Sequence, residues 1–244
     1  MVNDGFVNEE KLKEYINSKT YSDYNPNIQK FLFFTFGKNF DSSKTFLAKK
    51  KTGQIKPDLS IIHNGIEKCI SVKKGSGNSV HQEKIDVFFP FVETLIDTNT
   101  LNKLKKFHYG DNTINDTGVI RYTAAECRNK YSKEISYLNS KFNHWDKLEH
   151  FLERFLFIGN VGTLSVDIIY HGTIDDGLWA TKDEIKKYIK NNTFCENVVH
   201  FGPLTYQVWG RNEKRKAKHP DRRYVMQIKW GSLVKDLKKI RKVV

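Results

Sequence analysis

The chain has little of what marks secreted, disulfide-stapled or membrane proteins. It contains three cysteines in 244 residues, and because Cys69, Cys127 and Cys195 are far apart, their spacing predicts neither a zinc site nor a disulfide framework. No apolar run approaches the roughly 18 residues of a membrane span. The acidic start of the chain has no apolar signal segment. We therefore expect a cytoplasmic protein with no membrane partner.

Acidic residues are outnumbered as well. The chain has 41 Lys and Arg against 28 Asp and Glu, a net charge of +13. Much of the excess falls in the last quarter, where residues 191–244 hold 13 basic and four acidic side chains. Such a concentration indicates a polyanionic partner, and ordinary surface charge is the alternative. The 17 Phe, 11 Tyr and 4 Trp exclude a disordered basic tail.

The chain lacks glycine-rich phosphate loops and internal repeats, and its strands and helices alternate without the spacing of a Rossmann or barrel chain. Its length suits one large domain. The spacing of apolar residues predicts a core at about 1–97 and 160–244, with a polar helical insertion at about 98–157. The predicted helices are 4–16, 25–34, 80–96 (interrupted or kinked at Pro90), 123–139, 143–157 and 181–190. The predicted strands are the 56–74 hairpin, 164–172, 204–209 and 224–229.

A carboxylate and a lysine stand out in the predicted hairpin. Asn64-Gly65 is a strong two-residue turn signal because both residues tolerate positive φ. On the second strand Ser71 and Lys73 share one face, so closing the hairpin is expected to bring Asp58 near Lys73. A carboxylate beside an ammonium suits metal-assisted phosphodiester cleavage. There are two alternatives. Asp58 could be only a turn residue, since Pro-Asp is a common turn pair, and Lys74 could take the place of Lys73 if the strand had the other register.

Pro57-Asp58 followed by Ser71-Val72-Lys73 resembles the signature of the PD-(D/E)XK nucleases, the superfamily of most type II restriction enzymes. The sequence departs from that signature at Ser71, where the family has an acid. Some branches are similar in carrying serine there, with a glutamate supplied from the following helix, and Glu83 is the candidate here.

The resemblance implies an α/β fold of the restriction-endonuclease type: a mixed central sheet flanked by helices, here with a helical insertion. It implies Mg²⁺, or Mn²⁺ as a substitute, held by Asp58, the Val72 carbonyl and Glu9 or Glu83. Glu9 lies where many of these nucleases place a glutamate on the first helix. The neighbouring Glu10 could take this role instead, or Glu9 could be an ordinary solvent-exposed helix residue. Lys73 would orient or help deprotonate the attacking water.

The implied partner is double-stranded DNA, in a prokaryotic or phage system that also has a methyltransferase but forms no stable complex with it. Monomer and homodimer both stay open. Residues that suit base or phosphate contacts lie at 78–82, where the 75–79 loop leads into the next predicted helix, in the strand 204–209 and in the basic loop that follows it. They are Asn78, His81, Gln82, Thr205, Gln207, Arg211, Asn212, Lys214, Arg215, Lys216, Lys218, Arg222 and Arg223.

Three alternatives remain beside a sequence-specific, Mg²⁺-dependent endonuclease that leaves 5′-phosphate and 3′-hydroxyl ends. The absence of an acid at Ser71 makes a non-catalytic DNA-binding protein on the same fold a rival. A repair or recombination nuclease that recognises DNA structure is a second. A basic RNA-binding protein is the third.

Overall fold

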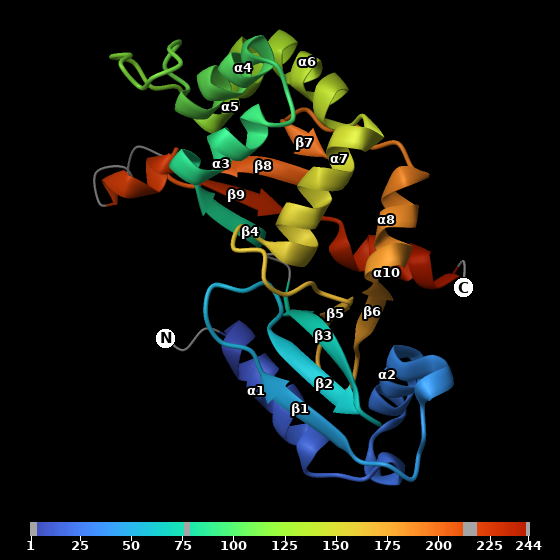
Figure 1. Cartoon of the computed structure of the whole chain (residues 1–244). Coiled ribbons are helices and arrows are strands. Elements are labelled where there is room, and N and C mark those ends of the chain that lie inside the picture. Colours follow the sequence, from blue (N-terminus) through green and yellow to red (C-terminus); the bar gives the residue numbers. More distant parts are fainter. Residues whose placement is uncertain (1–3, 76–78, 212–218, 243–244) are drawn as a thin grey trace. The chain divides into compact units, whose positions relative to one another are not determined.

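A computed structural model describes residues 4–75, 79–211 and 219–242. The chain folds into two compact units (Figure 1). Unit 1 comprises Met1–Asn78, Glu153–Asn191 and Ser232–Val244, and unit 2 comprises Ser79–Leu152 and Asn192–Gly231. No described helix is long and apolar enough to cross a membrane.

Unit 1 is built on a mixed five-stranded sheet with the order β1-β2-β3-β5-β6. Its strands are β1 (Phe46–Lys50), β2 (Leu59–His63), β3 (Ile66–Lys73), β5 (Ile168–His171) and β6 (Leu178–Thr181). The pairing of β3 with β5 is parallel, and the other pairings are antiparallel. Its α-helices are α1 (Asp4–Asn17), α2 (Pro26–Phe36), α8 (Lys182–Lys190) and α10 (Leu233–Lys242). It also has the short 3-10 turns η1 (Tyr21–Asp23) and η2 (Gly37–Asn39) and the π-helical segment η3 (Glu153–Ile158).

The core of unit 1 lies between the sheet and the two N-terminal helices. Leu12 and Ile16 of α1, and Phe31 of α2, are at most 1% exposed and belong to one cluster with the inward residues of β1, β2, β3 and β5. Alternation places Ile70 and Val72 in this cluster. Burial of this apolar face holds α1 against the sheet.

Unit 2 contains an antiparallel four-stranded sheet with the order β4-β9-β8-β7 (Figure 1). Its strands are β4 (Ser79–Lys84), β7 (His200–Phe201), β8 (Leu204–Val208) and β9 (Val225–Lys229), and η4 (Pro220–Tyr224) precedes β9. The helices are α3 (Ile85–Glu93), α4 (Thr98–Tyr109), α5 (Ala124–Lys130), α6 (Ser132–Phe142) and α7 (Trp145–Leu152). Phe201 of β7 packs between Phe142 and Phe151, with ring centroids 4.9 and 4.4 Å away.

The structure confirms most predicted elements, shortens the strand predicted at 164–172 to Ile168–His171, and corrects the start of one helix. The hairpin forms as predicted, with φ of 50° at Asn64 and 77° at Gly65. The helix predicted from Val80 is wrong at its start, because Ser79–Lys84 is strand β4 and α3 begins only at Ile85. Gln82, Glu83 and Lys84 favour helix locally, but pairing with β9 overrides that preference.

The expected insertion at about 98–157 and the core boundaries stay predictions. In the structure, α3 contacts β4, while α6 and α7 contact β7. The helices of this region therefore share unit 2 with the late strands β8 and β9. Short strands β1, β6 and β7 and helices α4 and α10 had not been predicted.

Candidate active site

The backbone around Asp58 is held on both sides by neighbouring strands. Asp58 directly precedes β2, and its N–H donates to the Ile70 carbonyl of β3 at 2.9 Å. Its own carbonyl accepts from the Lys51 N–H at 3.0 Å. The hairpin thus extends one residue beyond the regular strand and fixes the position from which the Asp58 carboxylate projects.

One oxygen of the Asp58 carboxylate receives three hydrogen bonds. Asp58 Oδ2 accepts from the Val72 N–H at 2.7 Å, from Ser71 Oγ at 3.1 Å and from Lys73 Nζ at 3.2 Å. Within the described residues, no hydrogen bond reaches Oδ1. The carboxylate is therefore oriented through one oxygen, and the other can accept a ligand from outside.

The structure brings Asp58 and Lys73 together, as the hairpin argument predicted. Their side chains are 24% and 21% exposed, so the pair is only partly accessible to solvent. Lys73 Nζ also donates to the Val72 carbonyl at 3.1 Å. The ammonium is thus fixed between a carboxylate and a backbone oxygen.

Glu9 supplies a second carboxylate near this pair. Its side chain lies on α1, is 10% exposed, and its Oε2 is 3.5 Å from Lys50 Nζ. Burial and the negative charge of Asp58 raise the pKa of Glu9, and Lys50 and Lys73 offset part of that effect. Two carboxylates close enough to repel each other are a site where a cation is favoured.

Lys50 belongs to this group and had not been predicted. Lys50 ends β1 and lies in phase with the buried Phe46 and Ala48. Its ammonium contacts Glu9 and lies 5.3 Å from the ring centre of Phe6. The alternation from Phe46 to Lys50 was the signal that could have identified it.

The donor set fits a magnesium ion. Mg²⁺ prefers oxygen ligands and is usually held by one or two carboxylates together with water and substrate phosphate. Asp58, Glu9 and the Val72 carbonyl are oxygen donors of this kind. No cluster of three His, Cys, Asp or Glu side chains suited to a metal occurs in the part of the chain that the structure describes, so an ion here would depend on water or phosphate for its remaining ligands.

Glu83, the other candidate acid, lies in unit 2. It is on β4 with 1% of its side chain exposed, and its Oε2 is 3.1 Å from His81 Nε2. His81 is 6% exposed, so the pair is internal to that unit. The role of Glu83 as the second acid and that of His81 as a DNA contact stay predictions.

The predicted DNA-contacting residues fall into different environments. Thr205 is half-buried and Gln207 exposed on β8, and Gln82 is exposed on β4. The guanidinium of Arg222 lies 4.3 Å from the Trp209 ring centre, and that of Arg223 pairs with Asp116. Six of the predicted residues lie outside the described residues: Asn78, Asn212, Lys214, Arg215, Lys216 and Lys218.

Arg211 is directed into unit 2. Its guanidinium donates to the Phe107 and His108 carbonyls at 2.6 and 3.1 Å and to Cys127 Sγ at 2.8 Å. Burial lowers the pKa of Arg211. These contacts anchor the start of the basic loop to α4 and α5, a role that could not be predicted from the local sequence.

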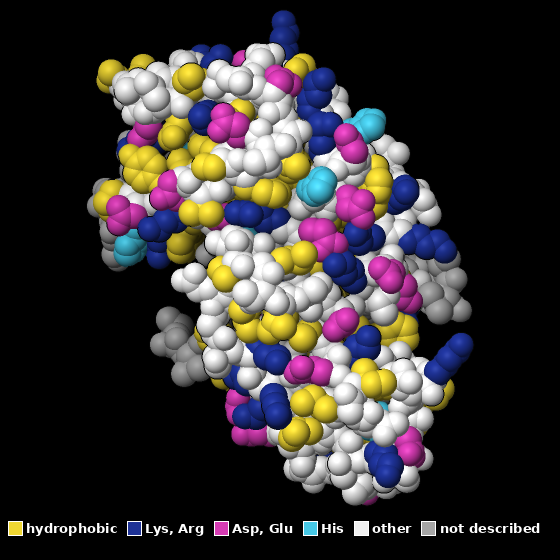
Figure 2. All heavy atoms as spheres, viewed as in Figure 1, with side chains coloured by type: hydrophobic (Ala, Val, Ile, Leu, Met, Phe, Trp, Pro, Cys, Tyr) yellow, Lys and Arg dark blue, Asp and Glu magenta, His cyan; other side chains and the backbone are white. Residues whose placement is uncertain are grey.

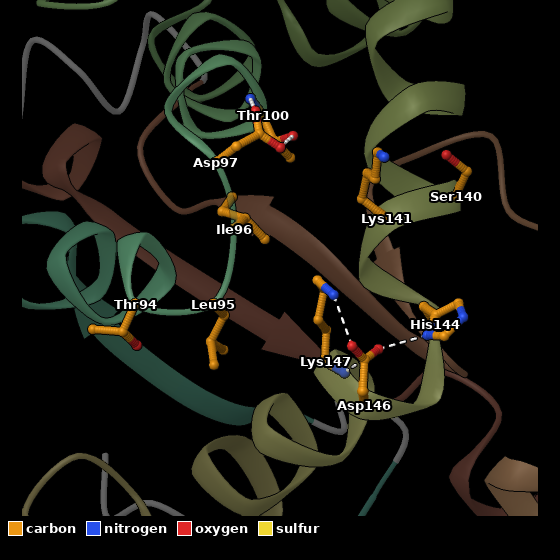
Figure 3. A pocket seen from close by; sticks show the side chains of 10 residues that line it. All are labelled: Thr94, Leu95, Ile96, Asp97, Thr100, Ser140, Lys141, His144, Asp146 and Lys147. Carbon is orange, nitrogen blue, oxygen red and sulfur yellow. Dashed lines mark hydrogen bonds and ion pairs between the residues drawn. The ribbon is translucent and has the colours of Figure 1, made fainter.

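A cavity of about 450 Å³ in unit 2 contains none of the predicted site residues. Figure 3 shows Asp146 on its wall, paired with His144 and Lys147 at 2.6 and 2.8 Å. Asp97, also on the wall, caps α4 by accepting from the Thr100 N–H. These charged side chains of the cavity wall thus serve local pairs and a helix cap, and the Asp58–Lys73 pair lies in unit 1.

Comparison with known proteins gives one informative result. No protein-family model matches the chain, and no curated protein matches it. A solved structure that it resembles is the restriction endonuclease MspI in complex with its cognate DNA. The TM-score is 0.51 at 14% sequence identity, over 91% of this chain and 83% of that chain. At this identity the likeness shows the fold, and the chain has a restriction-endonuclease-like α/β fold.

Proposed function

We propose that the protein is a Mg²⁺-dependent, sequence-specific endonuclease for double-stranded DNA. The observation that carries this proposal is the Asp58–Lys73 pair with Glu9 beside it, on a sheet of the restriction-endonuclease type. Each group has a use in phosphodiester hydrolysis. The serine at position 71 is compatible with this use, because its hydroxyl orients the Asp58 carboxylate.

Asp58 and Glu9, with the Val72 carbonyl, would hold the Mg²⁺, which when bound supplies charge neutralisation at the scissile phosphate. Lys73 is placed to orient a water molecule, because its ammonium is itself fixed by Asp58 and Val72. The water oxygen attacks phosphorus and the bond to the 3′-oxygen breaks. The products are a 5′-phosphate and a 3′-hydroxyl.

The charge of the chain supports a DNA substrate. A net charge of +13 favours a polyanion. Figure 2 shows Lys and Arg side chains spread over the face drawn, interspersed with Asp and Glu. Contacts of Lys and Arg with a phosphate backbone set position and not sequence.

A non-catalytic DNA-binding protein on the same fold is the second candidate. Ser71 stands where the nuclease signature has an acid, and the described residues include no three-ligand acidic cluster. A protein of this kind would keep the fold and the basic charge and would bind Mg²⁺ weakly or not at all.

Incubation of supercoiled plasmid with the protein, in Mg²⁺, Mn²⁺ or EDTA, tests the proposal. We expect discrete fragments with either metal and none with EDTA. Lys73→Ala should abolish cleavage, and Lys74→Ala is the matched control because this neighbouring lysine is exposed. Binding of DNA without cleavage under every condition would favour the non-catalytic candidate, and a uniform smear would contradict sequence specificity.

A further inference from the structure

The four-stranded sheet of unit 2 has one apolar and one polar face. On β9, Met226 and Ile228 are fully buried, while Val225, Gln227 and Lys229 are half-buried. On β8, Leu204 and Tyr206 are buried and Gln207 is exposed. The helices of unit 2 cover the apolar face, so the polar face remains available to a ligand.

Three glutamines form a row across this polar face. Gln227 of β9 lies directly opposite Gln82 on β4 and opposite Gln207 on β8. These three strands are neighbours in the sheet (Figure 1). Directly opposed residues on adjacent strands point to the same side, so the three side-chain amides project together.

A second polar row runs beside the first. Lys229 lies opposite Ser79 on one side and opposite Thr205 on the other. A register shift between Ser79 and His81 makes this possible, because a bulge changes which face the following residues occupy. The two rows together form a polar surface of amides, hydroxyls and one ammonium.

Most hydrogen-bonding groups of the first row are not used within the sheet. Among the described residues, none hydrogen-bonds to the side chains of Gln82 and Gln207. Gln227 Nε2 donates to Ser79 Oγ at 2.9 Å, which fixes the central side chain and leaves its carbonyl oxygen and second N–H for a ligand. The row thus consists of two exposed amides, of Gln82 and Gln207, on either side of one fixed amide, of Gln227, and all three have hydrogen-bonding groups left for a ligand.

The size of the row matches a segment of duplex DNA. Neighbouring strands are about 4.8 Å apart, so the three amides span about 10 Å. Base pairs are stacked about 3.4 Å apart, so a span of about 10 Å corresponds to about three base pairs. The same span is smaller than the width of the major groove, which is about 12 Å. A glutamine amide matches adenine, donating to N7 and accepting from the N6 amino group.

We infer that the row Gln82–Gln227–Gln207 reads base edges in the major groove and that Gln227 selects an A·T pair. This inference rests on the proposed function and adds to it the residues that determine sequence preference. Gln227 is the new and central member, because its strand joins the two outer glutamines that the sequence suggested separately.

Selection of binding sites from a randomised duplex pool in EDTA tests the inference. The wild-type protein should select a site containing an A·T pair, and Gln227→Ala should lose discrimination at that pair by about 5- to 150-fold. Gln227→Glu keeps the shape but offers only acceptors, so the preference at that position should move toward C·G. Asn129→Ala, an exposed amide on α5 of the same unit, is the matched control and should leave the preference unchanged.

The outcomes separate this inference from the function on which it rests. A wild-type protein that binds all duplexes alike refutes sequence-specific recognition altogether. A wild-type protein with a clear preference that survives unchanged in both Gln227 variants overturns the inference alone. Loss of discrimination only at G·C pairs would also overturn it, because the amide would then not be selecting adenine.

Discussion

Replacement of Glu9 by glutamine should stabilise the protein in the absence of divalent cations and reduce its cleavage of DNA. Burial and the charge of Asp58 raise the pKa of Glu9, and Lys50 and Lys73 compensate only in part. The folded protein therefore disfavours the ionised form. Glutamine keeps nearly the same shape and carries no charge, so it avoids this cost while losing the ability to bind a cation.

The gain in stability should depend on pH in a defined direction. A carboxyl group with a raised folded-state pKa binds its proton more tightly in the folded than in the unfolded protein. Wild-type stability should therefore fall, relative to Glu9→Gln, as the pH rises from about 4.5 through the folded-state pKa, and the difference should then level off. Each pKa unit of displacement corresponds to about 1.4 kcal/mol, and each kcal/mol moves Tm by about 2–4 °C in a chain of this size.

Thermal unfolding in EDTA between pH 4 and 8 measures this difference. Glu10→Gln is the matched control, because the bond to Lys13 lowers the pKa of Glu10. A carboxylate whose pKa is lowered in the folded state stabilises the protein at pH values above its unfolded-state pKa. The Tm of Glu10→Gln at neutral pH should therefore be lower than that of wild type or the same. Addition of Mg²⁺ should raise the Tm of wild type more than that of Glu9→Gln.

Two results would refute this reasoning. A lower Tm for Glu9→Gln than for wild type at neutral pH in EDTA would mean that the Glu9–Lys50 pair outweighs burial and repulsion. Full cleavage activity in Glu9→Gln would remove Glu9 from the metal site and leave Glu83 as the remaining acid to test.

Three further predictions concern unit 2 and the basic loop. Arg211→Ala should lower the free energy of unfolding by about 1–3 kcal/mol, because it leaves buried carbonyl groups without a donor; chemical denaturation measures this, and a loss of affinity confined to the cognate duplex would instead support a base contact. Lys216→Ala should weaken binding to all duplexes alike and reduce the salt slope by about 0.9, as filter binding at several salt concentrations would show, and a loss on one sequence only would contradict it. Burial lowers the pKa of His108 to about 3, so on acidification His108 is protonated in the unfolded chain before it is protonated in the folded protein. The free energy of unfolding should therefore fall as the pH drops below about 6.5. A free energy of unfolding that stays constant from pH 7 to 5 would contradict this prediction.

The sequence by itself determined the local part of the site. The Asn64-Gly65 turn and the alternation on the second strand fix the hairpin register, so the approach of Asp58 to Lys73 could be predicted without a structure. The first helix could also be predicted from local sequence. Its start at Asp4 and its apolar side predict a helix that carries Glu9, and the structure has this helix as α1. Short-range geometry is predictable because few residues and one turn decide it.

Only the tertiary structure decided the remaining contacts. The proximity of Lys50 to Glu9 depends on packing of α1 against β1, and the inward direction of Arg211 depends on carbonyl groups about a hundred residues earlier in the chain. The glutamine row needs β4 to pair with β9, where Gln227 and Ser79 are 148 residues apart. Gln82 to Lys84 favour a helix when considered alone, and the partner strand overrides that local preference because it offers backbone hydrogen bonds and burial that no isolated segment can supply.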